Sequence, residues 1–270
     1  MLRLVPTPIG NIQDITLRAI EALKSAQILL CEDTRVIKKL INLLNLDIKT
    51  SKIKSVHKYN INEFLSKIDP SFFEKDVVYV SDAGMPGVSD PGVELIRYCQ
   101  KNGIEYDVFP GASAFVTAFV ASGFEGEFSF FGFLPHSGKK REERLEQILN
   151  HHLTSIIYEA PHRLLKLLDE IYKIDEKREL FLAKELTKMH QTFFRGSAKN
   201  LLESLSQENI RGEWVVVISA SSEVKKESLI TKSDILKLNI PKKDKAKLLA
   251  KLTDRPIKDC YRDLVLSVKK

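Results

Sequence analysis

The sequence lacks any apolar run approaching the roughly 18 residues that a membrane-spanning helix needs, so we expect no membrane span. Cysteine is scarce: Cys31, Cys99 and Cys260 are scattered and odd in number, which argues against a disulfide framework and is typical of a cytoplasmic protein. Because the first residues lead straight into a strand-like segment, we expect no secretory leader. The histidines show no metal-ligand spacing, so we expect no metal site.

Three common catalytic or nucleotide-binding motifs are also missing. There is no G-x-x-x-x-G-K-[ST] phosphate loop, no G-x-G-x-x-G fingerprint and no G-x-S-x-G nucleophile elbow. The sequence therefore does not predict a P-loop nucleoside triphosphatase, a dinucleotide-binding enzyme or an α/β-hydrolase.

The positive charge is concentrated at one end of the chain. Residues 223–270 carry 14 Lys+Arg against 7 Asp+Glu, whereas the rest of the chain carries 28 against 29. A basic appendage on a near-neutral body suggests a polyanionic partner. Charge alone leaves open the alternative of a solvated tail without a partner.

The order of apolar segments predicts an α/β protein in three parts. Strand-like and helix-like segments alternate over residues 1–122, which predicts an N-terminal domain with a mostly parallel sheet covered on both faces. Residues 123–220 mix strands and helices less regularly and form a second α/β domain. Residues 221–270 begin as a Ser/Lys/Glu-rich linker and continue as short helices that resemble a helix-turn-helix.

The most unusual segment is residues 79–92, which read YVSDAGMPGVSDPG after an apolar run. Its glycines permit left-handed backbone or close approach, and its prolines stiffen it. Asp82 and Asp90 place carboxylates where ligands of open α/β sheets bind. A plain strand-to-helix connection takes about 2–6 residues, so this loop is longer than a connection requires.

Similar polar loops follow other apolar runs. Because carboxyl ends of parallel strands lie along one edge of a sheet, such loops can converge on one cleft between the domains. The loops are residues 6–11, 32–35, 81–92, 110–114, 158–163 and 184–187.

These loops carry a family resemblance. VPTPIGN, EDTR, SDAGMPGVSDPG, PGASA, FxFxGFLP, YEAPHRL, AKELTK and GEWVVVI occur in that order over residues 2–219. The series resembles the tetrapyrrole-methylase superfamily and, within it, the ribosomal RNA small subunit methyltransferase I family, which 2′-O-methylates a cytidine ribose in the decoding region of 16S rRNA. The resemblance implies the two-domain tetrapyrrole-methylase fold, S-adenosylmethionine (SAM) as cofactor, the small ribosomal subunit as partner and a homodimer.

The resemblance also implies the residues that surround SAM. From the first domain they are Pro8, Ile9, Gly10, Asp82, Ala83, Gly84, Pro86, Asp90, Ser113 and Ala114. From the second domain they are Tyr158, Leu186 and Gly212.

A ribose hydroxyl becomes a good nucleophile only when its proton is removed or its developing charge is stabilised. The candidates for these roles follow strand ends: Glu159, Lys184, Glu185, Asp33 and Arg35. Each could instead serve as a salt-bridge partner or a helix cap. RNA phosphates need cations, and the expected contacts are Lys139, Lys140, Arg141, Arg144, Lys242, Lys243, Lys245, Lys247 and Lys251.

Two other functions remain open. One is methylation of a tetrapyrrole precursor by an enzyme of the same superfamily, although such a site needs no basic tail. The other is a non-catalytic RNA-binding protein, which would not need polar loops at nearly every strand end.

Overall fold

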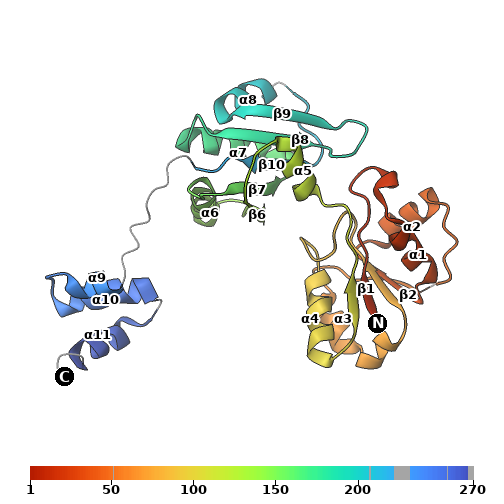
Figure 1. The fold of residues 1–270 in the computed structure, drawn as a ribbon, viewed down its shortest axis with the longest axis horizontal. Helices are drawn as coiled ribbons and strands as arrows, with labels where there is room; N and C mark the ends of the chain where they lie inside the picture. Colours follow the sequence, from red (N-terminus) through yellow and green to blue (C-terminus); the bar gives the residue numbers. More distant parts are fainter. Residues whose placement is uncertain (51, 207, 222–231, 254, 267–270) are drawn as a thin grey trace. The chain divides into compact units, whose positions relative to one another are not determined.

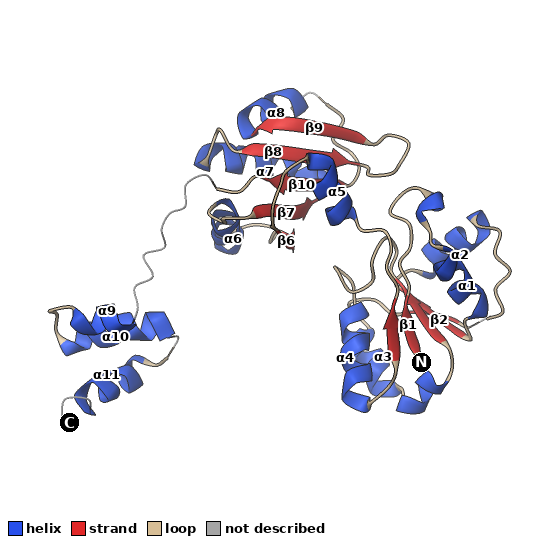
Figure 2. Ribbon diagram, viewed as in Figure 1, coloured by secondary structure: helices blue, strands red, loops and turns tan. Residues whose placement is uncertain are grey.

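A computed structural model describes residues 1–50, 52–206, 208–221, 232–253 and 255–266. The chain divides into two compact units, residues 1–222 and 223–270. Figures 1 and 2 show that the first unit contains two separate sheets, each accompanied by helices, and that the described residues of the second unit form helices and the turns between them.

The first sheet has five parallel strands in the order β3-β2-β4-β1-β5. Its strands are β1 (Leu2–Leu4), β2 (Ile28–Cys31), β3 (Ile53–Ser55), β4 (Val77–Val80) and β5 (Tyr106–Val108). β2 and β4 are buried at every position, which explains why they read as unbroken apolar runs rather than alternating patterns.

Helices cover both faces of this sheet. Against one face pack α1 (Leu17–Ser25) and α2 (Thr34–Leu43), and against the other α3 (Ile61–Lys67) and α4 (Gly92–Asn102). Two 3-10 turns, Ile12–Asp14 and Pro70–Glu74, complete the connections. The sequence expectation of a parallel sheet covered on both faces is confirmed.

The second sheet is mixed, in the order β6-β7-β10-β8-β9. Its strands are β6 (Phe128–Phe133), β7 (Thr154–Glu159), β8 (Glu179–Lys184), β9 (Thr192–Ser197) and β10 (Trp214–Ile218). Only the β6–β7 pair is parallel, because β10 runs opposite to both neighbours and β8 opposite to β9.

One face of this sheet packs against α6 (Lys139–Leu149), α7 (Pro161–Ile174) and α8 (Ala198–Leu205). The other face packs against α5 (Ala114–Ser122), through Ala118 and neighbouring aromatic side chains. The sequence groups residues 114–122 with the first domain, but by packing α5 covers the second sheet.

Residues 223–270 form their own unit, with α9 (Lys232–Lys237), α10 (Lys242–Thr253) and α11 (Ile257–Leu266). Their small core consists of Ile235, Ala246, Leu249, Ala250, Cys260 and Leu264. In the described part of the chain, no helix combines the length and apolar character needed to cross a membrane.

Candidate active site

Loops from the first sheet are joined by backbone hydrogen bonds. Thr7 and Gly84 exchange both N–H···O bonds at 3.0 Å, so the loop after β1 pairs with the long loop after β4. A Cβ on Gly111 would lie 2.6 Å from the Cβ of Pro6, so the loop after β5 also packs closely here. The three loops therefore form one surface at the carboxyl edge of the sheet.

The long loop folds back on itself around Asp90. The Oδ1 atom of Asp90 accepts hydrogen bonds from Gly87 N at 2.6 Å and Gly92 N at 2.9 Å. Gly87 has φ +90°, and a Cβ on Gly92 would lie 2.7 Å from Gly87 N, so both positions require glycine. This geometry explains why the segment is rich in glycine.

The second sheet contributes an edge where three strand ends lie in register. Trp214 at the start of β10 pairs with Glu159 at the end of β7 and with Lys184 at the end of β8. Because β10 is antiparallel to both neighbours, its first residue lies at the same edge as their last residues.

Two loops close this edge, and the loop after β8 also contacts the first domain. Lys188 Nζ donates to Glu185 Oε1 and Glu213 Oε2, each at 2.9 Å, which joins the loop after β8 to the segment before β10. Glu185 and Thr187 have φ of 52° and 62°, unusual for residues with side chains. The hydroxyl of Thr187 accepts a hydrogen bond from Asn11 N at 2.9 Å, which ties this loop to the first domain.

A cavity of about 380 Å³ lies between these surfaces. Its lining comes from both sheets and includes Met85, Val88, Phe133, Glu213 and Trp214 beside the residues expected there. The volume falls within the range of small-molecule sites.

Most residues expected to surround a cofactor line this cavity. They are Ile9, Ala83, Gly84, Asp90, Ser113, Ala114, Tyr158, Leu186 and Gly212. Pro8, Gly10, Asp82 and Pro86 are not among the lining residues. Gly10 instead packs against the loop after β8, and Asp82 Oδ1 accepts a hydrogen bond from Asp33 N.

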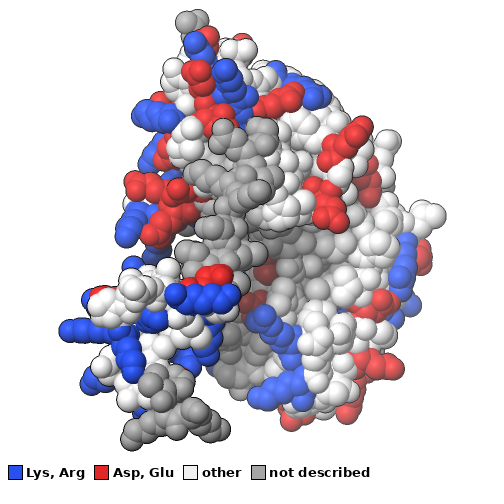
Figure 3. All heavy atoms as spheres, turned by 60° about the vertical axis from the view of Figure 1, so that its left-hand side comes forward, with Lys and Arg blue, Asp and Glu red and all other residues white. Residues whose placement is uncertain are grey.

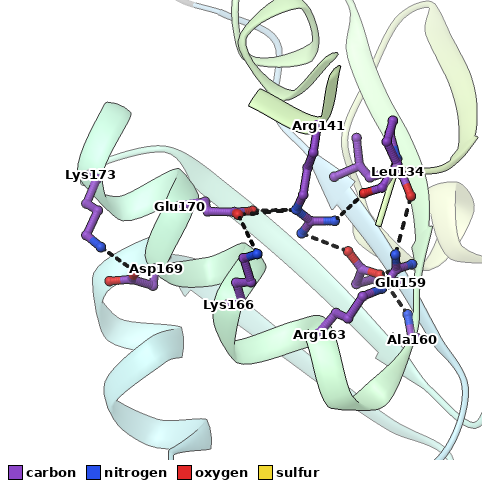
Figure 4. A network of polar contacts seen from close by, with 10 residues as sticks. Leu134, Arg141, Glu159, Ala160, Arg163, Lys166, Asp169, Glu170 and Lys173 are labelled. Carbon is purple, nitrogen blue, oxygen red and sulfur yellow. Dashed lines mark hydrogen bonds and ion pairs between the residues drawn. The ribbon is translucent and has the colours of Figure 1, made fainter. Parts of the chain in front are cut away.

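Glu159 also lines the cavity, but its side chain is completely buried. Figure 4 shows its carboxylate between two guanidinium groups: Arg141 donates to Oε2 at 3.1 Å and Arg163 pairs with Oε1. Oε1 also accepts from Ala160 N at 2.9 Å. A carboxylate engaged in this way is poorly suited to accept a substrate proton, so this geometry favours a structural role for Glu159 over the role of a base.

Arg141, expected among the RNA contacts, is buried in the same network. Its side chain is 1% exposed and also pairs with Glu170 at 2.9 Å, so it cannot contact RNA phosphates as expected. Arg144 is half-buried, with its guanidinium 4.8 Å from the ring centroid of Phe131. Lys139 and Lys140 remain exposed at the start of α6.

The other expected catalytic groups form internal pairs. Lys184 Nζ donates to the Asn209 carbonyl and lies 5.6 Å from the Trp214 ring centroid, and it is not among the residues lining the cavity. Burial alone would raise the pKa of Glu185, but hydrogen bonds from Lys188 and from Glu213 N outweigh it and lower that pKa. Asp33 caps α2 and pairs with Arg35, whose hydrogen bonds lower the Asp33 pKa to about 2.

Carboxyl groups in the long loop, and Glu32 beside it, behave in the opposite way. Burial raises the pKa values of Glu32, Asp82 and Asp90, and neighbouring carboxylates add to the effect. No group of three or more His, Cys, Asp or Glu within the described ranges is arranged to hold a metal ion.

We expect Asp90→Asn to raise the melting temperature of the ligand-free protein at pH 7.5. Because the folded-state pKa of Asp90 is raised, the folded protein binds this proton more tightly than the unfolded chain, and ionisation costs stability as pH rises. Asn keeps an oxygen for Gly87 N and Gly92 N. In thermal melts, the gain in melting temperature should shrink as the pH falls toward the pKa of aspartate in the unfolded chain, about 3.9.

Asp33→Asn is the matched comparison with the opposite sign. The lowered pKa of Asp33 stabilises the folded state above the unfolded pKa, and this contribution is lost as pH falls toward 2. Asp33→Asn should therefore lower the melting temperature at pH 7.5. Equal shifts in both variants would contradict this account.

Comparison with known proteins gives consistent matches. Residues 1–202 match the family described as Tetrapyrrole (Corrin/Porphyrin) Methylases. The protein named Ribosomal RNA small subunit methyltransferase I of Helicobacter pylori is 43% identical, covering 100% of this chain and 99% of that protein. The protein of the same name from Campylobacter fetus is 44% identical, covering 98% of this chain and 100% of that protein.

Two solved structures share the fold. A cobalt precorrin-4 methyltransferase superposes with a TM-score of 0.60 at 17% identity, covering 81% of this chain and 94% of that chain. Uroporphyrin-III-C-methyltransferase from Thermus thermophilus superposes with a TM-score of 0.56 at 19% identity, covering 81% of this chain and 93% of that chain. At these identities the likeness concerns the fold alone.

Proposed function

This chain belongs to the tetrapyrrole methylase family and, within it, to the ribosomal RNA small subunit methyltransferase I family, and from that premise we propose that it methylates small-subunit ribosomal RNA with SAM as donor. The observation that carries the proposal is the cavity lined by loops from both sheets. The finer proposal is transfer to the 2′-oxygen of a cytidine in the decoding region of 16S rRNA.

The cavity suits SAM in size and lining. Its volume of about 380 Å³ and its small and apolar side chains leave room for the adenosine and methionine parts. Asp90, whose pKa is raised by burial, offers a carboxylate to a cationic ligand group, which would offset the cost of keeping it ionised. Ile9, Ser113, Tyr158 and Leu186 would wall the donor on both sides.

When bound, SAM supplies a sulfonium-linked methyl group that a nucleophile displaces in line. The chain's main contribution is then to hold the ribose hydroxyl in position, worth up to roughly 7–11 kcal/mol in favourable cases. Rigid loops on both walls, fixed by the Thr7–Gly84 pair and the Lys188 ion pairs, are suited to this task.

Exposed lysines would bind the RNA backbone. Lys242, Lys243 and Lys251 are exposed on the C-terminal helices, whereas Lys245 donates to the Leu236 carbonyl and Lys247 pairs with Asp244. Figure 3 shows lysine and arginine side chains projecting from the C-terminal helices. A ribosomal substrate would place the enzyme in the cytoplasm.

The direct test incubates the purified protein with methyl-labelled SAM and either 30S subunits lacking the modification or a tetrapyrrole precursor. We expect label in 16S rRNA at a ribose 2′-oxygen. Label in the tetrapyrrole alone, or RNA binding without SAM uptake, would reject the proposal. Uptake can be followed by fluorescence, because the chain's single tryptophan, Trp214, lines the cavity.

Removing residues 223–270 should weaken 30S binding by at least about tenfold without changing SAM affinity, because phosphate contacts dominate such binding. The first unit has its own cores and should fold alone. A triple Lys242→Gln/Lys243→Gln/Lys251→Gln variant should reproduce part of the loss and reduce the salt dependence of binding, measured by filter binding. Unchanged binding in both variants would remove the tail from recognition.

We also propose a homodimer that uses α5. Val116 and Val120 lie one turn apart and are 42% and 72% exposed, so they form an apolar flank not covered within the described chain. Sedimentation of Val120→Glu should show a smaller species than the parent protein; equal species would place any interface elsewhere.

A further inference from the structure

One aromatic ring at the cavity is left exposed. The other phenylalanines of β6, Phe128, Phe130 and Phe131, are all partly buried against hydrophobic cores. Phe133, at the end of the strand, is 56% exposed and lines the cavity. Because more than half of the Phe133 side chain is exposed, its outer part does not pack against the described chain.

The local backbone holds Phe133 in this position. The pairing of β6 with β7 shifts between Phe130 and Gly132, and Gly132 takes a left-handed φ of 65°. After this bulge Phe133 pairs with Tyr158, and their ring centroids lie 5.4 Å apart at 59°. Tyr158 therefore supports one side of the Phe133 ring, which leaves another side open.

The segment after Phe133 is anchored and leads to cations. Figure 4 shows Arg163 donating to the Leu134 carbonyl, at 3.5 Å, and Arg141 donates to the Pro135 carbonyl at 3.1 Å. A few residues later Lys139 and Lys140 begin α6, both exposed, with Lys139 in a long 3.6 Å pair with Glu143. The buried arginine–glutamate network thus fixes the path between the exposed ring and these lysines.

We infer that the open face of Phe133 stacks on the base of the RNA nucleotide that enters the cavity, with Lys139 and Lys140 beside the neighbouring phosphates. Proteins that recognise unpaired nucleotides commonly place bases on aromatic rings next to cationic side chains. Stacking the base at the cavity wall would direct its ribose toward the donor site. This inference rests on the proposed function and names the substrate contact that the function requires.

The test compares Phe133→Leu and Phe133→Trp with the parent in methyl transfer to 30S subunits. Phe133→Leu keeps an apolar side chain but removes the π-face, so we expect KM for 30S subunits to rise about 5- to 150-fold, the range for losing one stacked base. Phe133→Trp should stay within about threefold of the parent, because indole also stacks. SAM affinity, measured by calorimetry, should change less than about twofold in either variant.

Phe193→Leu is the matched control. Its ring is 45% exposed on β9, at the opposite edge of the same sheet, and it does not line the cavity. Phe193→Leu should leave the KM for 30S subunits unchanged, and thermal melts should confirm that all variants are folded.

Three results would overturn the inference. A KM for 30S subunits in Phe133→Leu equal to that of the parent would mean that the Phe133 ring does not stack on a base. A loss of SAM affinity with unchanged KM for 30S subunits would assign the ring to the donor's adenine. Failure of the parent itself to methylate 30S subunits would reject the proposed function, and this arm separates that outcome from a failure of the stacking contact alone.

Discussion

Replacing Glu159 by alanine is expected to lower the free energy of unfolding by about 3–5 kcal/mol, measured by urea denaturation. The Arg141 side chain is 1% exposed and would lose one of its two carboxylate partners, while Arg163 would lose its own. Removing one member of a buried ion pair leaves an uncompensated charge in a low-dielectric site, which is the costly part of the change.

Two control variants separate burial from pairing. Glu63→Ala breaks a surface pair with Lys67, in which both side chains are more than 60% exposed, and should lower the free energy of unfolding far less, because solvent and salt screen such pairs. Glu170→Ala removes a partner of Arg141 that is 22% exposed, and its loss of unfolding free energy should fall between those of the other two variants. Equal destabilisation by Glu159→Ala and Glu63→Ala would mean that burial adds nothing to the contribution of the ion pairs drawn in Figure 4.

The first sheet could be predicted because two of its inner strands, β2 and β4, are buried on both faces. Such strands appear in the sequence as short unbroken apolar runs, and parallel pairing then places their following loops at one edge. Glycines and prolines in the loop after β4 indicated a special backbone, and the left-handed Gly84 and Gly87 agree with that reading.

The packing of α5 could not be predicted in the same way. Its sequence is apolar on nearly all sides, so no stripe indicates which sheet it covers. Adjacency along the chain favoured the first sheet, but the helix packs with Ile156, Phe181 and Val217 of the second.

Trp214 was missed for a topological reason. Ligands of a parallel sheet gather at the carboxyl ends of its strands, and the sequence predicts the site from those ends. β10 is antiparallel to its neighbours, so its first residue reaches the same edge. The single tryptophan at the start of an apolar run was the available signal.

Arg141 was misjudged because a sequence gives the sign of a charge but not its burial. Lys139, Lys140, Arg141 and Arg144 form one basic cluster in the sequence, yet a helix separates adjacent residues by about 100° around its axis. Arg141 therefore faces the core with Leu145 and Ile148, while the lysines face solvent.

Gly10→Ala is expected to weaken SAM binding by about 5- to 150-fold, the equivalent of 1–3 kcal/mol of overpacking. A Cβ at this position would lie 2.5 Å from Lys188 Cγ, 2.6 Å from Thr187 Oγ1 and 2.7 Å from the Leu186 carbonyl oxygen. The lysine side chain can move, but the carbonyl belongs to the backbone and the Thr187 hydroxyl is held by Asn11 N. The two loops must therefore separate.

This separation should act on the cavity more than on either domain. Ile9 and Leu186 are neighbours of the clash, belong to one hydrophobic cluster and both line the cavity, one from a loop of each sheet. Calorimetric titration with SAM would measure the loss, with Gly196→Ala on β9 as the control, since a Cβ there meets atoms only at 3.7 Å or beyond. If Gly10→Ala binds SAM as tightly as the parent, the contact between these loops is not needed to hold the donor, and the cavity must be closed by the loop after β4 alone.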